Sequence, residues 1–174
     1  MKKMMNQLFL SLALVCSLGF FSSLQAQKIA IVDINAVLES MEDYKNAQTD
    51  LDRTASKWRQ EIAQEYDKIK GTYSKYQAEM VLMSDDMKRQ KEDEIMGMEQ
   101  NVREMQKQKF GPDGALFKKR QDLVQPIQDK VYAAIEKYAG ERGYDFIFDK
   151  SSSSGIIFNN ARFDKTEDIL SRVK

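Results

Sequence analysis

Apolar residues recur at intervals of three and four along most of the chain, which is the spacing of a helix that buries one face. The pattern begins at Asn35 and continues to Arg142, whereas an average helix in a globular domain has only about 11 to 12 residues. In its first half the apolar positions run from Met41 to Met83 as the seam of a coiled coil. The spacing therefore predicts long helical arms.

The chain is expected to reverse direction about halfway along this region. Four consecutive apolar residues, Met80-Val81-Leu82-Met83, interrupt the seam, and Ser84 follows them. Serine is a favoured N-cap residue, and Asp85 and Asp86 suit the positive end of a helix dipole. A second seam then returns toward the C-terminus. These features predict an antiparallel helical hairpin with an apolar tip.

Two glycines and two prolines mark where the returning arm is expected to bend. Gly111, Pro112 and Gly114 fall within four residues, so a kink, a short loop or a bulge is predicted there. Pro126 is a milder interruption, because the apolar register continues across it, and it is expected to bend the arm without ending it. These four residues are the hinge candidates.

Short β-like runs stand on both sides of the helical region. Residues 28–32 form the first strand, and the alternation of apolar and polar residues over 144–149 predicts a second strand. Residues 151–155 are expected to turn and residues 156–158 to return, which would complete a hairpin. Residues 164–167 have the spacing of a capping box ahead of a final short helix.

The expected fold class is α+β and mostly α. A small β-rich body would comprise residues 28–34 and 143–174, and the helical arms would comprise residues 35–142. Two paired helices bury only a small hydrophobic core between them, so oligomerisation through the body is expected.

The first 26 residues are interpreted as a cleaved secretory signal. The apolar stretch from Leu8 to Phe21 has 14 residues, too few for a membrane span of about 20, and Ala26 is the small residue that signal peptidase needs. A lipoprotein signal is the alternative, since Cys16 lies in this stretch, but Val15 precedes it where lipoboxes carry a small residue. One secreted domain, residues 27–174, is predicted.

Composition argues against catalysis and against binding to nucleic acid. The sequence has no histidine and its single cysteine is Cys16, so the mature chain offers no thiol or imidazole chemistry. Without the two lysines of the signal, the chain has 25 basic and 27 acidic residues, a net charge of −2. This net charge does not favour binding to nucleic acid or to an anionic membrane. No glycine-rich phosphate loop follows a strand. We expect no enzyme activity, no cofactor and no metal site.

Methionine is frequent around the predicted tip, and its flexible thioether adapts to varied apolar partners. Contact with a partner protein and packing within the seam explain these residues equally well. The candidates for such contact are Met80, Val81, Leu82, Met83, Met87, Met98 and Met105. A basic cluster on the returning arm is interpreted either as an exposed stripe or as a site for anionic lipid or acidic chains, and it comprises Lys107, Lys109, Lys118, Lys119 and Arg120.

The order of these elements resembles that of the Skp (OmpH-like) family of periplasmic chaperones of outer-membrane proteins. Besides the signal, the resemblance rests on Lys28-Ile29-Ala30-Ile31-Val32-Asp33, Pro126-Ile127, Ala134-Ile135, Gly143-Tyr144-Asp145-Phe146-Ile147-Phe148-Asp149 and Asp164-Lys165-Thr166-Glu167-Asp168-Ile169-Leu170. The segment Phe110-Gly111-Pro112-Asp113-Gly114 followed by Leu116-Phe117-Lys118-Lys119-Arg120 is similar to a subgroup of that family.

This resemblance implies a homotrimer in the periplasm, with three helical hairpins projecting like tentacles around a cavity. Unfolded outer-membrane β-barrel proteins would be held there as clients, without ATP or a cofactor. The oligomerisation body would include Ile29, Ile31, Phe146, Ile147, Phe148, Ile157, Phe158, Ile169 and Leu170. The best-known members are strongly basic, unlike this chain, so the apolar tip and methionine-rich arm, or the basic cluster locally, are expected to capture clients.

A structural spacer or adaptor of the cell envelope is the alternative function. It would use the same coiled-coil arms to engage one specific partner. Binding to a single saturable partner, instead of to many unfolded chains, would distinguish it.

Overall fold

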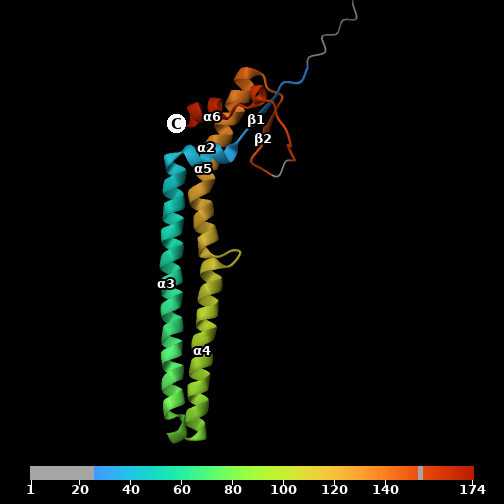
Figure 1. Cartoon of the computed structure of the whole chain (residues 1–174). Helices are drawn as coiled ribbons and strands as arrows, with labels where there is room; N and C mark the ends of the chain where they lie inside the picture. The colour runs from blue at the N-terminus through green and yellow to red at the C-terminus, as the bar shows by residue number, and fades with distance from the viewer. Residues whose placement is uncertain (1–25, 153–154) are drawn as a thin grey trace, which may run out of the picture.

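The computed structural model describes residues 26–152 and 155–174, so nearly all of the predicted signal lies outside the described part of the chain. Figure 1 shows a long rod of two helical arms with a small body at one end. The elements are β1 (Ile29–Val32), α2 (Ile34–Ser40), α3 (Glu42–Glu79), the 3-10 turn η1 (Met80–Leu82), α4 (Asp85–Phe110), α5 (Ala115–Arg142), β2 (Phe146–Asp149), the 3-10 turn η2 (Ala161–Phe163) and α6 (Thr166–Val173). The predicted α+β, mostly α class is confirmed.

The outgoing arm is a single helix, whereas the returning arm is built from two. Helix α3 has 38 residues without a break, and α4 and α5 of the returning arm have 26 and 28. A short helix, α2, precedes the outgoing arm and ends at Ser40, and its C-cap residue Met41 has an extended backbone. Within the described residues, no helix is both long and apolar enough to cross a membrane.

The two arms meet along a narrow seam. Ile62, Ile69 and Tyr76, spaced by seven residues, are buried against Ile95 and Val102 of α4. Not every apolar position that fits the three-and-four spacing is buried, because the side chains of Tyr66 and Tyr73 of α3 and Met87 of α4 are each about half exposed. Two helices cover only a narrow stripe of each other, so residues at its margins stay in contact with solvent.

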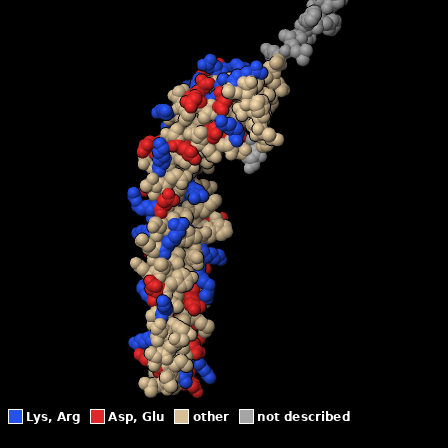
Figure 2. Space-filling model, viewed as in Figure 1, with Lys and Arg blue, Asp and Glu red and all other residues tan. Residues whose placement is uncertain are grey.

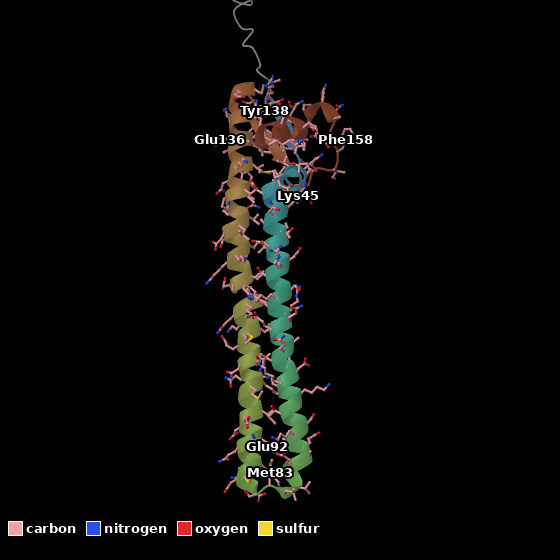
Figure 3. The ribbon with its side chains drawn as sticks, turned by 90° about the vertical axis from the view of Figure 1, so that its left-hand side faces the viewer. Lys45, Met83, Glu92, Glu136, Tyr138 and Phe158 are labelled. Carbon is pink, nitrogen blue, oxygen red and sulfur yellow. The ribbon has the colours of Figure 1, made fainter. Side chains whose placement is uncertain are left out.

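The reversal at the tip is confirmed. Helix α3 gives way to η1, and the Ser84 hydroxyl caps α4 by accepting a hydrogen bond from the Met87 amide at 3.4 Å. Just behind the tip, the Tyr76 hydroxyl donates to Glu92 Oε1 across the seam at 2.6 Å (Figure 3). This bond joins the two arms close to their far end.

The predicted interruption of the returning arm is a short loop, Gly111–Gly114, which projects sideways from the rod (Figure 1). The Gly111 amide donates to the Lys107 carbonyl at 2.8 Å, and the Gly114 amide donates to the Gly111 carbonyl at 2.9 Å. We call this segment the mid-arm loop. Pro126, in contrast, lies inside α5, which continues past it to Arg142.

The body contains a two-stranded parallel sheet in which β1 pairs with β2 from Ile29↔Phe146 to Val32↔Asp149. The predicted hairpin between residues 144–149 and 156–158 is wrong, because residues 156–158 form no strand. β1 already provides β2 with a partner, and an alternating pattern does not specify which strand pairs with which. The predicted capping box is also incomplete, since Lys165 is the N-cap of α6 and makes no side-chain cap.

The main core lies where the body meets the bases of both arms. Its buried residues come from β1, α2, the junction of α2 with α3, α5 and α6, and they are Val32, Val37, Leu38, Met41, Val131, Tyr138, Ile169 and Val173. The side chain of Tyr138, labelled in Figure 3, lies in this core. Its hydroxyl donates a hydrogen bond to Asp168 Oδ2 at 3.0 Å, and burial raises the pKa of Tyr138 above its usual value. The core therefore fixes the arms to the body.

Candidate functional site

Most of the exposed large apolar residues lie at the tip and on strand β2 with the segment that follows it, and Phe117 lies beside the mid-arm loop. These three surfaces form the candidate functional site. The other exposed large apolar residues are spread along the arms, namely Tyr66, Tyr73, Met96 and Tyr132. Among the described residues, no three histidine, cysteine or carboxylate side chains are arranged to hold a metal ion. Figure 2 shows acidic and basic side chains interspersed along the rod.

At the tip, η1 presents two aliphatic side chains to solvent. Val81 is 85% exposed and Leu82 is 91% exposed. Ser84 caps the next helix directly after this turn, so the arms close without needing either side chain in their seam. The tip therefore displays apolar surface that the hairpin itself does not use.

The seven predicted contact residues separate into two groups. Four are exposed, namely Met80, Val81, Leu82 and Met87. Three pack against the seam cluster, namely Met83, Met98 and Met105. Met96, one of the methionines frequent near the tip, is not among the seven predicted contact residues although it is 57% exposed. Its position outside the three-and-four spacing of the seam is the signal that could have identified it.

An aromatic and charged cluster joins the arms beside the mid-arm loop. Trp58 of α3 packs edge-on against Phe110 of α4, with ring centroids 6.2 Å apart. Lys109 lies 5.4 Å above the Trp58 ring and forms an ion pair with Glu61. The hydrogen bond from Lys109 lowers the pKa of the Glu61 carboxyl. Lys109 therefore connects the two arms and differs from the rest of the predicted basic cluster.

The other four residues of that cluster, Lys107, Lys118, Lys119 and Arg120, form no ion pair with any described residue. They lie on both sides of the mid-arm loop in sequence. The loop also brings the predicted hinge residues Gly111, Pro112 and Gly114 together, whereas Pro126 lies elsewhere in α5.

In the body, β2 exposes aromatic rings. Phe146 and Phe148 stack on each other, with ring centroids 6.2 Å apart, and are 49% and 42% exposed. Ile157 is fully exposed and Phe158 is 84% exposed. Of the other residues predicted for oligomerisation, Ile31 and Ile169 are buried in this chain's own core, and Ile29, Ile147 and Leu170 are partly buried.

A polar network holds the body's segments together next to this surface. Lys150 Nζ lies 2.8 Å from Asp164 Oδ2 and 3.7 Å from Asp33 Oδ2. The Thr166 hydroxyl donates to Asp164 Oδ1 at 2.6 Å and accepts from the Asp33 amide at 3.0 Å. Partial burial raises the pKa of Asp164, but the hydrogen bonds from Lys150 and Thr166 lower it overall to about 2.

The sequence and the fold of this chain were compared with those of known proteins. The sequence profile of the outer membrane protein (OmpH-like) family matches residues 28–173. A comparison with curated protein sequences gives no match. Among solved structures, the chain is similar to a candidate outer membrane chaperone (OmpH-like) from Caulobacter crescentus, with a TM-score of 0.69, 10% sequence identity, and coverage of 85% of this chain and 84% of that one. At this level of identity, the structural similarity shows the fold alone.

Proposed function

The chain belongs to the OmpH-like outer membrane protein family, and on that premise we propose that it is a periplasmic chaperone that holds unfolded outer-membrane β-barrel proteins without ATP. The tip carries this proposal. Val81 and Leu82 are almost fully exposed at the far end of a hairpin that does not need them for packing. Exposed apolar residues in such a place are suited to contact other chains.

Weak contact is what a holding function requires. Fully burying one valine or leucine side chain contributes only about 1.5 to 3 kcal/mol, so one tip alone binds an apolar segment loosely. Several arms acting on one client would raise the overall affinity, because the second contact forms within the same complex. The client would then stay bound while its individual segments continue to exchange.

We propose that the arms come together by trimerisation through the exposed face of the body. Phe146, Phe148, Ile157 and Phe158 offer it an apolar surface. A sheet of only two strands is marginally stable by itself, and the strand edge that β2 does not share with β1 is open to further pairing. Copies joined here would place their arms around a shared space.

The holding function is tested by refolding a β-barrel protein from denaturant and following its aggregation by light scattering. We expect the wild type to suppress aggregation and the Val81→Ser, Leu82→Ser double variant to suppress it less. Tyr132→Ser is the matched control, since Tyr132 is 52% exposed but lies on α5, away from the tip. Equal aggregation with and without the wild type would refute the proposal, and capture of one saturable partner from an envelope extract would favour a spacer or adaptor.

Trimerisation is tested separately by native mass measurement. We expect a trimer for the wild type and a monomer for the Phe146→Ser, Phe148→Ser double variant. Both side chains are substantially exposed, so serine should leave the core of each chain intact, which circular dichroism can verify. A wild-type monomer at working concentrations would contradict this assembly.

A further inference from the structure

The mid-arm loop lies apart from both the tip and the body face. We propose that the loop and its flanks form a second client-contact site, which binds an aromatic side chain carried in an acidic stretch of an unfolded polypeptide. The inference rests on the proposed holding function and assigns to it a site and a client chemistry. Four features of the loop support it: its fixed backbone, its grooves, its charge and its position.

Backbone hydrogen bonds hold the mid-arm loop in one conformation. Besides the hydrogen bonds that close Gly111 and Gly114, the Lys118 amide donates to the Gly114 carbonyl at 3.1 Å and so fixes the start of α5 to the loop. Gly114 is buried, and a Cβ atom there would lie 2.8 Å from the Gly111 nitrogen. Only glycine fits this close approach, so the sequence maintains one particular shape.

Grooves lie on both flanks of this projection. One has a volume of about 260 Å³ and is lined by Phe110, Gly111, Pro112, Leu116, Phe117 and Arg120. The other has a volume of about 400 Å³, and Lys107 and Lys118 are among its lining residues. Drug-sized ligands occupy pockets of roughly 300 to 1,000 Å³. The first groove is smaller than that and suits a single large side chain, while the second has room for the residues next to it.

The first groove combines an aromatic wall with a cation. Phe117 is 51% exposed and shares the groove with the side chain of Arg120. A second ring can pack against Phe117 at an offset or edge-on, and a guanidinium can lie over its face or bind a neighbouring carboxylate. An aromatic residue with an acidic neighbour satisfies both groups at once.

The charge around the loop favours an acidic occupant. Lys107, Lys118, Lys119 and Arg120 form no ion pair with the described residues, and Asp113 is the only acidic residue from Met105 to Gln121. The whole sequence, in contrast, has 27 basic and 27 acidic residues. The excess of basic residues along this stretch of the returning arm would attract carboxylates from solution, an attraction that salt weakens.

The position of the loop favours a polypeptide over a lipid surface. In Figure 1 the loop projects from the arm on the same side as strands β1 and β2 of the body. If copies join through the body, this side of the arm faces the space between them. A flexible chain can enter that space and fill a concave groove, whereas a bilayer is broad and presents no such segment.

The experiment uses the purified full chain and a fluorescently labelled synthetic peptide that alternates phenylalanine with aspartate, followed by anisotropy. We expect Phe117→Ser to weaken binding about tenfold, since the ring would lose roughly half of the burial energy of an aromatic side chain. The Lys118→Gln, Arg120→Gln double variant should weaken it about two- to fivefold and reduce its salt dependence. Tyr132→Ser and Lys137→Gln, both exposed on α5 outside the grooves, should bind as the wild type does.

The outcomes separate this inference from the proposed function. If the wild type suppresses aggregation but the Phe117 and Lys118/Arg120 variants bind the peptide unchanged, the mid-arm site is refuted and the holding function stands. Equal binding of a peptide with lysine in place of aspartate also refutes it. If the double variant loses binding only to vesicles of phosphatidylglycerol and phosphatidylcholine, the cluster is a lipid contact. Failure of the wild type both to bind the peptide and to suppress aggregation overturns both proposals.

Discussion

Replacing Asp164 by asparagine should remove a pH-dependent part of the body's stability. Its carboxylate accepts hydrogen bonds from Lys150 Nζ at 2.8 Å and from the Thr166 hydroxyl at 2.6 Å, and its backbone bridges to Ile31 of β1. Asparagine keeps the size of the side chain and one acceptor oxygen but carries no charge for Lys150. The substitution therefore tests the ion pair with little change in packing.

The magnitude follows from the pKa of this carboxyl group. Partial burial raises the pKa of Asp164, yet the hydrogen bonds from Lys150 and Thr166 lower it overall from 3.8 to about 2. One pH unit corresponds to about 1.4 kcal/mol, so ionised Asp164 adds about 2 kcal/mol to the free energy of unfolding at neutral pH. Because the pKa is lower in the folded state, this contribution is present above 3.8 and is lost as the pH falls through about 2.

Urea unfolding followed by circular dichroism, at one protein concentration and at several pH values from 7 to 2, measures this effect. We expect Asp164→Asn to be about 2 kcal/mol less stable than the wild type at pH 7, and the difference to disappear toward pH 2. Asp67→Asn is the control, since Asp67 is exposed on α3 and forms no ion pair with the described residues. A difference that stays constant across this range would contradict the ion-pair explanation.

Two glycines should respond in opposite directions to alanine. Gly97→Ala should stabilise α4 by about 1 kcal/mol, because a Cβ atom there meets open space. Gly114→Ala should destabilise the mid-arm loop by about 1 to 3 kcal/mol. Thermal unfolding measures both, and a change of melting temperature in the same direction for the two variants would refute this prediction. Val131→Ala should cost about 2 kcal/mol in urea unfolding, since Val131 is fully buried in the body core. Tyr76→Phe removes the donor to Glu92 and should speed hydrogen exchange near the tip, with the body unaffected.

The helical arms could be predicted from the sequence because their determinants are local. The three-and-four spacing of apolar residues predicts the arms, and Ser84 with the two acidic residues after it predicts where α4 begins. The pairing of β2 could not be predicted, because its partner β1 lies at the other end of the chain and an alternating pattern fits any neighbour. The predicted hairpin with residues 156–158 failed for this reason.

The candidate surfaces were only partly predictable. Sequence composition indicated the methionines, but only the packing of the arms shows that Met98 and Met105 lie in the seam while Met96 faces solvent. The sequence predicts Lys109 as part of one basic cluster with Lys107, Lys118, Lys119 and Arg120. The ion pair of Lys109 with Glu61, which lies 48 residues earlier in the chain, appears only when the two arms are side by side.

The pairing of β1 with β2 also sets the order in which this protein can fold. The Lys28 amide binds the Asp145 carboxylate across 117 residues, and contacts of such high contact order form slowly. The arms depend on contacts between neighbouring turns and across one reversal, so in a chain that emerges N-terminus first they can form before β2 exists. β1 therefore has no strand partner until the residues of β2 near the C-terminus have been synthesised. A copy whose arms are incomplete therefore has no finished body with which to join another.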